Sequence, residues 1–291
     1  MTLPSAKRQG DDLAKFRHSS EVCEYGILQT LDHLHVIQLI MLFAVIYSME
    51  TITTELRDKL SITVCPDDIS EYFKGIADLL MNKFVISKGK DKYEIIEVEF
   101  YLFAPNHPDV ITYPRNCKAG QWFFHQSGVD LTFETTNNQF GGILIRGLRK
   151  IGGDCEQIFG PLKCVEKLWD VFDAFDRVPS EYPVIEAHAF SGRAHKELLA
   201  FPRWIPLSAK KVQEAGNEEA KNSRVRSLCE NNQKLLTEHP ELGIDKDIYN
   251  EIEEGVAVKI VFESKYRFLE KGAIKKGDNA WLRYAAKPQS T

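Results

Sequence analysis

The chain has 291 residues, of which 43% are hydrophobic and 27% are charged, and it carries a formal net charge of −5 at pH 7. This composition is ordinary for a soluble globular protein and excludes collagen-like, coiled-coil and disordered chains. The negative charge also argues against a protein that holds nucleic acid mainly through charge, because neutralisation of phosphates supplies most non-specific affinity.

The first predicted region is an N-terminal extension at residues 1–65, which we expect to be partly helical. It contains the most hydrophobic stretch of the chain, VIQLIMLFAVIYSM at residues 36–49. The stretch is shorter than the ~20 residues needed to span a bilayer. We therefore favour a helix that is buried or contacts a protein partner, with a membrane anchor as the alternative.

The chain start and the cysteines both bear on the cellular compartment. The first twenty residues are polar, so no cleavable signal peptide is evident. The six cysteines lie far apart and form neither a CxxC pair nor a Cys/His cluster, so we expect no zinc site and no disulfide framework. These features predict an intracellular protein, cytoplasmic or nuclear, in a reducing compartment.

The next elements are a helix and a series of strands. The segment CPDDISEYFKGIADLLMNKFVIS predicts a helix with Asp67 or Asp68 at its N-cap and apolar residues at helical spacing as far as Phe84. Strands are then predicted at residues 93–103, 121–128, 129–134 and 141–148. Between the last two, TTNNQFGG offers Asn and Gly to adopt positive φ in a hairpin.

The C-terminal part alternates between predicted helices and strands. A helix is expected in FGPLKCVEKLWDVFDAF, and YPVIEAHAF and VAVKIVFESKYRFL read as strands. Between these strands lies an inserted helical region at about residues 208–256. From Glu214 to Glu254 it has eleven acidic residues against five Lys and Arg, a local net charge of −6 that leaves +1 for the rest. A protein partner could bind through this acidic segment, residues 214–254, or through the apolar stretch at residues 36–49.

Together these elements predict an α+β fold. We expect a single domain at residues 66–291, built on a largely antiparallel curved sheet with flanking helices, plus the helical N-terminal extension and the helical acidic insertion.

The strand at residues 93–103 carries the first candidate chemistry. Alternation places Ile96, Val98, Phe100 and Leu102 on one face, which is core, and Glu97, Glu99, Tyr101 and Phe103 on the other. Taken alone, Glu97 and Glu99 would be expected in solvent, because most glutamates are exposed.

Seven short motifs change that expectation for Glu99. They lie collinearly between residues 75 and 278 and read IADLLMNKFVIS, IIEVEFY, YPRN, GGILIRGL, FGPLKCVEKL, FPRWIPLS and KYRFLEKGAIKKG. In order and spacing the chain resembles the alkyladenine (methylpurine) DNA glycosylases, as a divergent member. The resemblance implies hydrolysis of N-glycosidic bonds that releases damaged, alkylated purines from DNA, with no metal or organic cofactor.

The resemblance also implies roles for individual residues. Glu99 matches the carboxylate that activates the attacking water, and Arg146 matches the arginine that holds this water beside it. Tyr101 matches the ring that stacks on the base rotated out of the helix. An arginine paired with Glu99 would also keep its carboxylate ionised.

Further matches concern the substrate. His107 lies where the family places a histidine against the flipped base, and His125 lies at the second stacking position, where an imidazole can stack or donate a hydrogen bond. Asp130 or Thr132 replaces the asparagine of the specificity pocket. Arg115 and Asn116 of YPRN are candidates to fix a loop or face phosphate, and Arg203 of FPRWIPLS is a candidate contact to nucleic acid.

One departure from the family bears on the substrate. Ser127 stands where the family has the aromatic wedge that fills the gap in the duplex, and serine cannot plug a base stack. Three functions therefore remain open: a glycosylase acting on double- or single-stranded DNA, a hydrolase of the same fold acting on a free nucleoside, a nucleotide or RNA, and a non-catalytic nucleic-acid-binding module.

Overall fold

The computed structural model describes residues 33–169, 182–188 and 194–273. Within helix α2 (His33–Leu60) only the backbone is described for residues 33–40, 42–46 and 48. Contacts divide the chain into two units, Met1–Glu50 and Thr51–Thr291. None of the helices within the described ranges is both long and apolar enough to cross a membrane.

The boundary between the units lies earlier than the predicted one at residue 65. Leu56 and Leu60 are buried, and the Tyr72 hydroxyl donates a 2.5 Å hydrogen bond to the Lys59 carbonyl. Residues 51–60 therefore pack as part of the larger unit. The partner contact predicted for residues 36–49 depends largely on side chains outside the described part.

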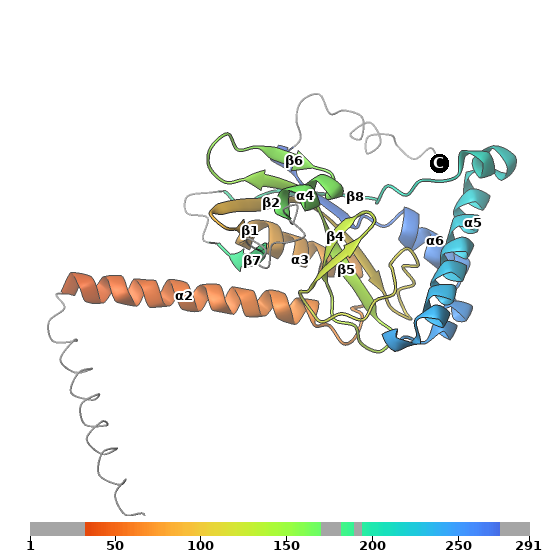
Figure 1. Ribbon diagram of the computed structural model, residues 1–291, viewed down its shortest axis with the longest axis horizontal. Helices are drawn as coiled ribbons and strands as arrows, with labels where there is room; N and C mark the ends of the chain where they lie inside the picture. Colours follow the sequence, from red (N-terminus) through yellow and green to blue (C-terminus); the bar gives the residue numbers. More distant parts are fainter. Residues whose placement is uncertain (1–32, 170–181, 189–193, 274–291) are drawn as a thin grey trace, which may run out of the picture. The chain divides into compact units, whose positions relative to one another are not determined.

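The larger unit is built on one sheet, which the described residues form from nine strands. The strands are β1 (Phe84–Lys88), β2 (Asp91–Phe103), β3 (Trp122–His125), β4 (Gly128–Thr132), β5 (Phe140–Lys150), β6 (Gln157–Phe159), β7 (Val184–Ala187), β8 (Leu198–Phe201) and β9 (Arg267–Glu270). The main order is β3-β4-β5-β2-β1-β7; β9 pairs with β2 and β8, and β6 pairs with β5. Every one of these pairings is antiparallel and the sheet is curled (Figure 1), which confirms the predicted α+β class.

Helix α3 (Ile69–Lys83) packs on one face of the sheet. Asp68 is its N-cap and accepts a 3.0 Å hydrogen bond from the Glu71 amide, as the sequence predicts. Phe73 stacks on Phe100 of β2 at 4.6 Å between ring centroids. The helix ends at Lys83, earlier than predicted, because Phe84 begins strand β1 and the apolar residues that follow it are buried in the sheet.

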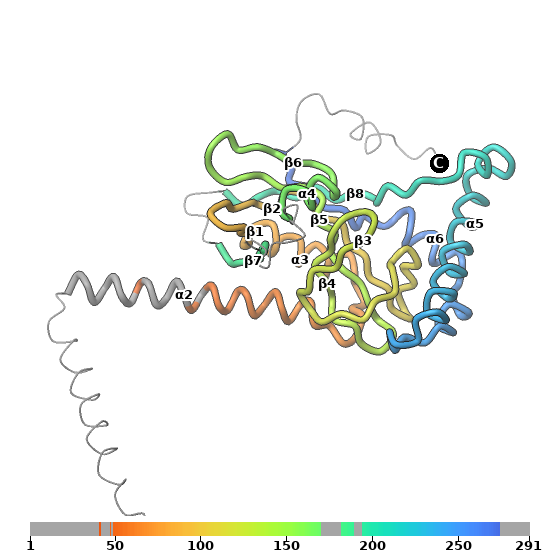
Figure 2. Tube along the Cα trace, viewed as in Figure 1, coloured from red at the N-terminus to blue at the C-terminus, as the bar shows by residue number. Residues whose placement is uncertain are grey.

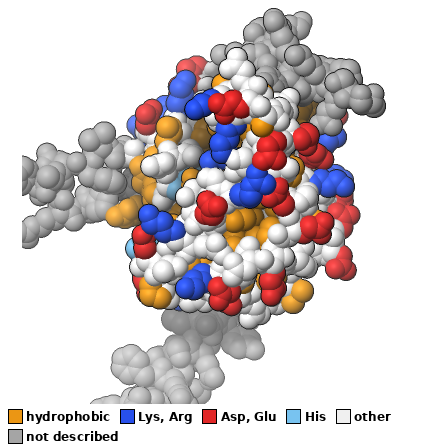
Figure 3. All heavy atoms as spheres, turned by 90° about the vertical axis from the view of Figure 1, so that its right-hand side faces the viewer, with side chains coloured by type: hydrophobic (Ala, Val, Ile, Leu, Met, Phe, Trp, Pro, Cys, Tyr) orange, Lys and Arg blue, Asp and Glu red, His pale blue; other side chains and the backbone are white. Residues whose placement is uncertain are grey.

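The predicted insertion is helical. It contains α5 (Ala209–Glu238), which has a non-helical residue at Gly216, the short helices η1 (Pro240–Leu242) and η2 (Lys246–Glu251), and α6 (Glu254–Phe262). In the Cα trace α5 and α6 lie side by side (Figure 2), and Arg226 of α5 pairs with Glu254 at 2.9 Å. On the side of the molecule where α5 lies, acidic and basic side chains are intermixed (Figure 3). The acidic insertion therefore does not form a surface of one charge sign.

Helix α6 corrects the prediction of a strand at VAVKIVF. Its Ala257, Val258 and Val261 are buried in a cluster with Phe103, the last residue of β2, and Phe140, the first residue of β5. The β-branched residues favour a strand locally, and tertiary packing overrides that preference. Only the last three residues of the predicted segment are in a strand, β9, which begins at Arg267.

Two other local predictions concern turns. Asn137 and Asn138 have φ of 47° and 63°, so the hairpin before β5 uses the positive φ values that asparagine tolerates. Helix α4 (Pro161–Leu168) follows Gly160 as predicted, and the rest of that predicted helix lies outside the described residues.

Candidate functional site

On the sheet face opposite α3, a cross-strand row through four strands carries charged residues on three of them. Glu99 on β2 is opposite Leu144 on β5, which is opposite Asp130 on β4; on its other side Glu99 is opposite Arg267 on β9. Residues directly opposite one another project to the same face of a sheet. The fold therefore gathers charged side chains from segments far apart in the sequence.

Two compensating bulges lie beside Glu99. Ile95 pairs with Leu148, Glu97 with Gly147, and Val98 with Ile145, so β2 has one extra residue before Glu97 and β5 has one extra residue at Arg146. Bulges interrupt the ladder locally and redirect a side chain. Arg146 is the unpaired residue of β5, and its side chain reaches toward both Glu97 and Glu99.

Glu99 is buried, with 2% of its side chain exposed, and its two carboxylate oxygens have different surroundings. Oε1 accepts a 2.5 Å hydrogen bond from the Tyr101 hydroxyl. Oε2 lies 3.1 Å from Nη1 of Arg146, an ion-pair contact without hydrogen-bond alignment. Among the described residues Oε2 has no hydrogen-bond partner, which is rare for a buried polar atom.

Arg146 and Arg267 share the carboxylate of Glu97. Oε1 of Glu97 accepts from Nε of Arg146 at 3.0 Å and from Nε of Arg267 at 2.7 Å, and Nη2 of Arg267 lies 2.6 Å away. Burial opposes the charged form of Arg146, but the adjacent Glu99 and Glu97 outweigh it and raise the pKa of its guanidinium. Burial, followed by the charge of Glu99, raises the pKa of Tyr101 well above its ordinary value, so its hydroxyl remains a donor.

A second polar group lies beyond Leu144. Asp130 is buried and accepts from Nη1 of Arg115 at 2.6 Å and from Nε2 of His125 at 3.0 Å. Burial alone would raise the pKa of Asp130, but the hydrogen bond from His125 and the charge of Arg115 outweigh it and lower this pKa. Arg115 also lies over the Phe123 ring at 4.2 Å.

The structure places His125 at the edge of this group. Its ring lies 5.7 Å from that of Tyr113 and 6.2 Å from that of Phe123, so it is part of an aromatic cluster. Thr132, the alternative to Asp130, is buried and donates to the Lys118 carbonyl at 2.7 Å.

His107 and Arg203 occupy interior positions. His107 is buried, with Nδ1 2.8 Å from the Leu102 carbonyl and Nε2 2.9 Å from the Tyr266 hydroxyl. Burial lowers the pKa of His107, so it stays neutral and uses both ring nitrogens internally. This arrangement does not direct His107 toward a base beside Glu99.

Arg203 is fully buried against Asp109, with both side chains 0% exposed. Its Nη1 and Nη2 each lie 2.7 Å from an oxygen of Asp109, and its guanidinium lies 4.9 Å from the Tyr101 ring. Burial opposes the charge of Arg203, but Asp109 outweighs it and raises the pKa. The predicted contact of Arg203 with nucleic acid does not fit this burial.

The remaining predicted residues lie on loops. The Asn116 side chain donates to the Leu242 carbonyl at 3.1 Å, which ties the YPRN loop to η1. The buried Arg115 donates from Nε to the Tyr113 carbonyl, so it fixes this loop and does not face phosphate. Ser127 is exposed at the tip of the β3–β4 hairpin.

Two neighbours of Glu99, Tyr101 and Arg146, are partly exposed, Arg146 with 22% of its side chain. Two clefts lie elsewhere. One of about 230 Å³ is lined by residues of α2, β1 and β7 together with Trp122, and one of about 370 Å³ lies between β6 and α4. The described residues contain no cluster of His, Cys, Asp and Glu able to hold a metal ion.

Comparisons with known proteins give one informative similarity. The chain is 30% identical over 132 residues to a protein of Acanthamoeba polyphaga mimivirus that is described only as uncharacterized. The match covers 36% of this chain, and the chain spans 61% of that relative's length. No family model and no solved structure matches the chain.

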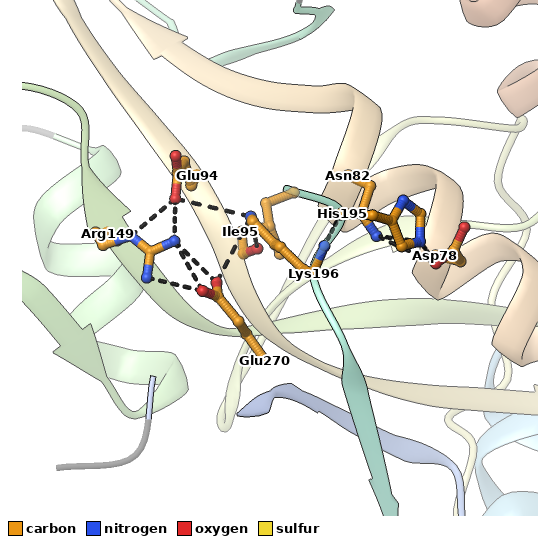
Figure 4. A network of polar contacts seen from close by, with 8 residues as sticks. All are labelled: Asp78, Asn82, Glu94, Ile95, Arg149, His195, Lys196 and Glu270. Carbon is orange, nitrogen blue, oxygen red and sulfur yellow. Dashed lines mark hydrogen bonds and ion pairs between the residues drawn. The ribbon is translucent and has the colours of Figure 1, made fainter. Parts of the chain in front are cut away.

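A second charged cluster lies at the other end of β2, outside the candidate site (Figure 4). Arg149 of β5 bonds to Glu94 of β2 and, at 2.9 Å, to Glu270 of β9. Nζ of the buried Lys196 lies 3.7 Å from both carboxylates. Two acidic and two basic groups balance here, and they tie three strands to the segment that carries Lys196.

Sequence reasoning did not single out three members of these groups, Glu97, Asp109 and Arg267. Glu97 was expected in solvent, and the structure buries it between two arginines. The alternation of β2 already placed Glu97 on the face of Glu99, and Arg267 lies in the KYRFLEKG motif. Those two signals could have marked each residue as a member of the site, although neither signal pairs the two.

Proposed function

We propose that this chain hydrolyses N-glycosidic bonds with a water molecule activated by Glu99. The observation that carries the proposal is the buried Oε2 of Glu99, which is beside Arg146 and has its hydrogen-bonding capacity unfilled. A carboxylate that is held by one oxygen and has unfilled hydrogen-bonding capacity at the other can accept a proton from water.

The surroundings of Glu99 support each part of this chemistry. The Tyr101 hydroxyl holds Oε1, which fixes the direction in which Oε2 points. Arg146 places a positive charge 3.1 Å from Oε2, on the side of the carboxylate that Tyr101 leaves without a hydrogen bond. As the glycosidic bond breaks, positive charge builds on the sugar, and the carboxylate of Glu99 stabilises that charge electrostatically.

The substrate class follows from the motif resemblance and the aromatic residues. Tyr101 is partly exposed beside Glu99, and we assign its ring to stack on a purine. The preferred substrate is an alkylated purine in DNA, released by base flipping as in base excision repair. The exposed serine at the hairpin tip favours a second candidate, a free nucleoside, a nucleotide or a base in RNA, because these substrates leave no gap in a duplex to fill.

The test is an excision assay with alkylated and deaminated oligonucleotides, single- and double-stranded, and with the corresponding free nucleosides. We expect Glu99→Gln to fold as the parent does and to lose roughly 10²- to 10⁴-fold in rate, the range typical for removing a general base. Glu230→Gln, which changes an exposed glutamate on α5, is the matched control and should keep the parental rate.

Equal turnover by Glu99→Gln and the parent would exclude Glu99 as the base. Binding of modified oligonucleotides without turnover of any substrate would instead favour a non-catalytic module. Turnover of nucleosides alone would select the second candidate.

A further inference from the structure

We infer that Glu97 is a positioning residue that keeps Arg146 from closing onto the reactive oxygen of Glu99. This inference rests on the proposed function of the same site. It concerns the carboxylate of Glu97, which the sequence predicted to be exposed to solvent.

The first step is how Glu97 binds Arg146. Its Oε1 accepts from Nε of Arg146 at 3.0 Å, so the inner nitrogen of the guanidinium is anchored. A planar guanidinium fixed at Nε can turn little, and Nη1 then lies 3.1 Å from Oε2 of Glu99 without hydrogen-bond alignment. The anchored arginine supplies charge to Glu99 and leaves Oε2 able to accept a hydrogen bond from water.

The second step is what holds Glu97 itself. Arg267 of β9 donates from Nε at 2.7 Å to the same Oε1, and its Nη2 lies 2.6 Å away. Arg267 therefore fixes Glu97 from the strand on its other side. On the β5 side, Gly147 leaves room for Glu97, since a Cβ at that position would lie 2.8 Å from the Glu97 Cβ. The bulge at Arg146 and the glycine after it thus allow Glu97 to lie between Arg146 and Arg267. We call this arrangement of the three side chains the clamp.

Without the charge of Glu97, the nearest carboxylate to Arg146 is that of Glu99. Arg146 should then turn and form an aligned hydrogen bond with Oε2, which occupies the position that water needs. In Glu97→Gln we expect kcat to fall by about 10- to 100-fold, the scale typical of small misplacements of a catalytic group, while KM stays within about threefold.

The control is Glu270→Gln, which neutralises a buried glutamate that binds an arginine in the second cluster. It should lower the melting temperature to a similar extent as Glu97→Gln and leave kcat unchanged. An equal loss of kcat in both variants would overturn the inference, because it would trace to general loosening of the sheet.

If Glu97→Gln fails to fold, Gly147→Ala displaces Glu97 without removing its charge, and the same fall in kcat is expected. Parental kcat in either folded variant, or a change confined to KM, would overturn the positioning role. A structural readout separates this inference from the proposed function. In NMR spectra the Nε–H signals of Arg146 and Arg267 should shift in Glu97→Gln even if the parent hydrolyses none of the substrates, and unshifted signals would refute the clamp.

Discussion

The buried pair of Arg203 and Asp109 allows a prediction with a magnitude. Each side chain is 0% exposed, and the guanidinium makes two 2.7 Å contacts with the carboxylate. Arg203 also donates to the carbonyls of Phe100 at 3.0 Å and Ile260 at 3.1 Å. In Arg203→Met a side chain of similar length remains, but Asp109 is left buried with its charge uncompensated.

Removing one partner of a buried ion pair costs about 3–5 kcal/mol of unfolding free energy. At about 2–4 °C per kcal/mol for a domain of this size, the melting temperature should fall by roughly 6–20 °C. Urea titration followed by circular dichroism measures the loss directly. Arg203→Met/Asp109→Leu should recover part of it, because the lone buried charge is then gone. A loss below about 1 kcal/mol in Arg203→Met would refute the view that this pair fixes the fold.

The same residue separates an internal role from a contact with nucleic acid. If Arg203 neutralised a phosphate, its removal would reduce the slope of log affinity against log salt by about 1. Because Arg203 is fully buried, we expect the slope measured with Arg203→Met, at a temperature where it is folded, to equal that of the parent. A reduced slope would show that Arg203 reaches phosphate.

Three further predictions follow from single contacts. Tyr101→Phe removes the donor to Oε1 of Glu99, and single-turnover rates should fall roughly 10- to 100-fold, since a hydrogen bond to a charged group is worth about 1.5–3 kcal/mol. Gly142→Ala would place a Cβ 2.8 Å from that of Asp130 and 3.2 Å from Nη1 of Arg115, so urea unfolding should show a loss of about 1–3 kcal/mol. The pKa of His107 is lowered from its ordinary 6.5 by burial, so its stabilising contribution is complete above 6.5 and is lost as pH falls through the folded-state pKa. Urea titrations over a pH series should show stability decreasing below 6.5, with a smaller decrease in His107→Gln.

Features that depend only on residues close together in the sequence were predictable. The cap of α3 needs only Asp68 and the amide of Glu71, and the hairpin before β5 needs only Asn137 and Asn138. The strand β2 follows from its own alternation. The α+β class follows because these elements are each specified within a few residues.

Features set by distant partners were not predictable. Glu97 is bonded to Arg267, 170 residues further along the chain, and no pattern around Glu97 reveals that guanidinium. His107 resembles a turn residue in sequence, and its burial depends on Tyr266. Similarly, VAVKIVF becomes helix α6 because it packs with Phe103 and Phe140, which lie outside any local window.

The charges around Glu99 bear on what the centre can recognise. Four guanidinium groups lie at this centre, and each is within ion-pair distance of one of four carboxylates: Arg115 with Asp130, Arg146 with Glu97 and Glu99, Arg203 with Asp109, and Arg267 with Glu97. These eight groups sum to zero, so together they present no net positive charge to a phosphate. Under the proposed function, recognition at this centre would rest on stacking and hydrogen bonds to a base, and any affinity for a nucleic-acid backbone would arise from side chains outside this centre.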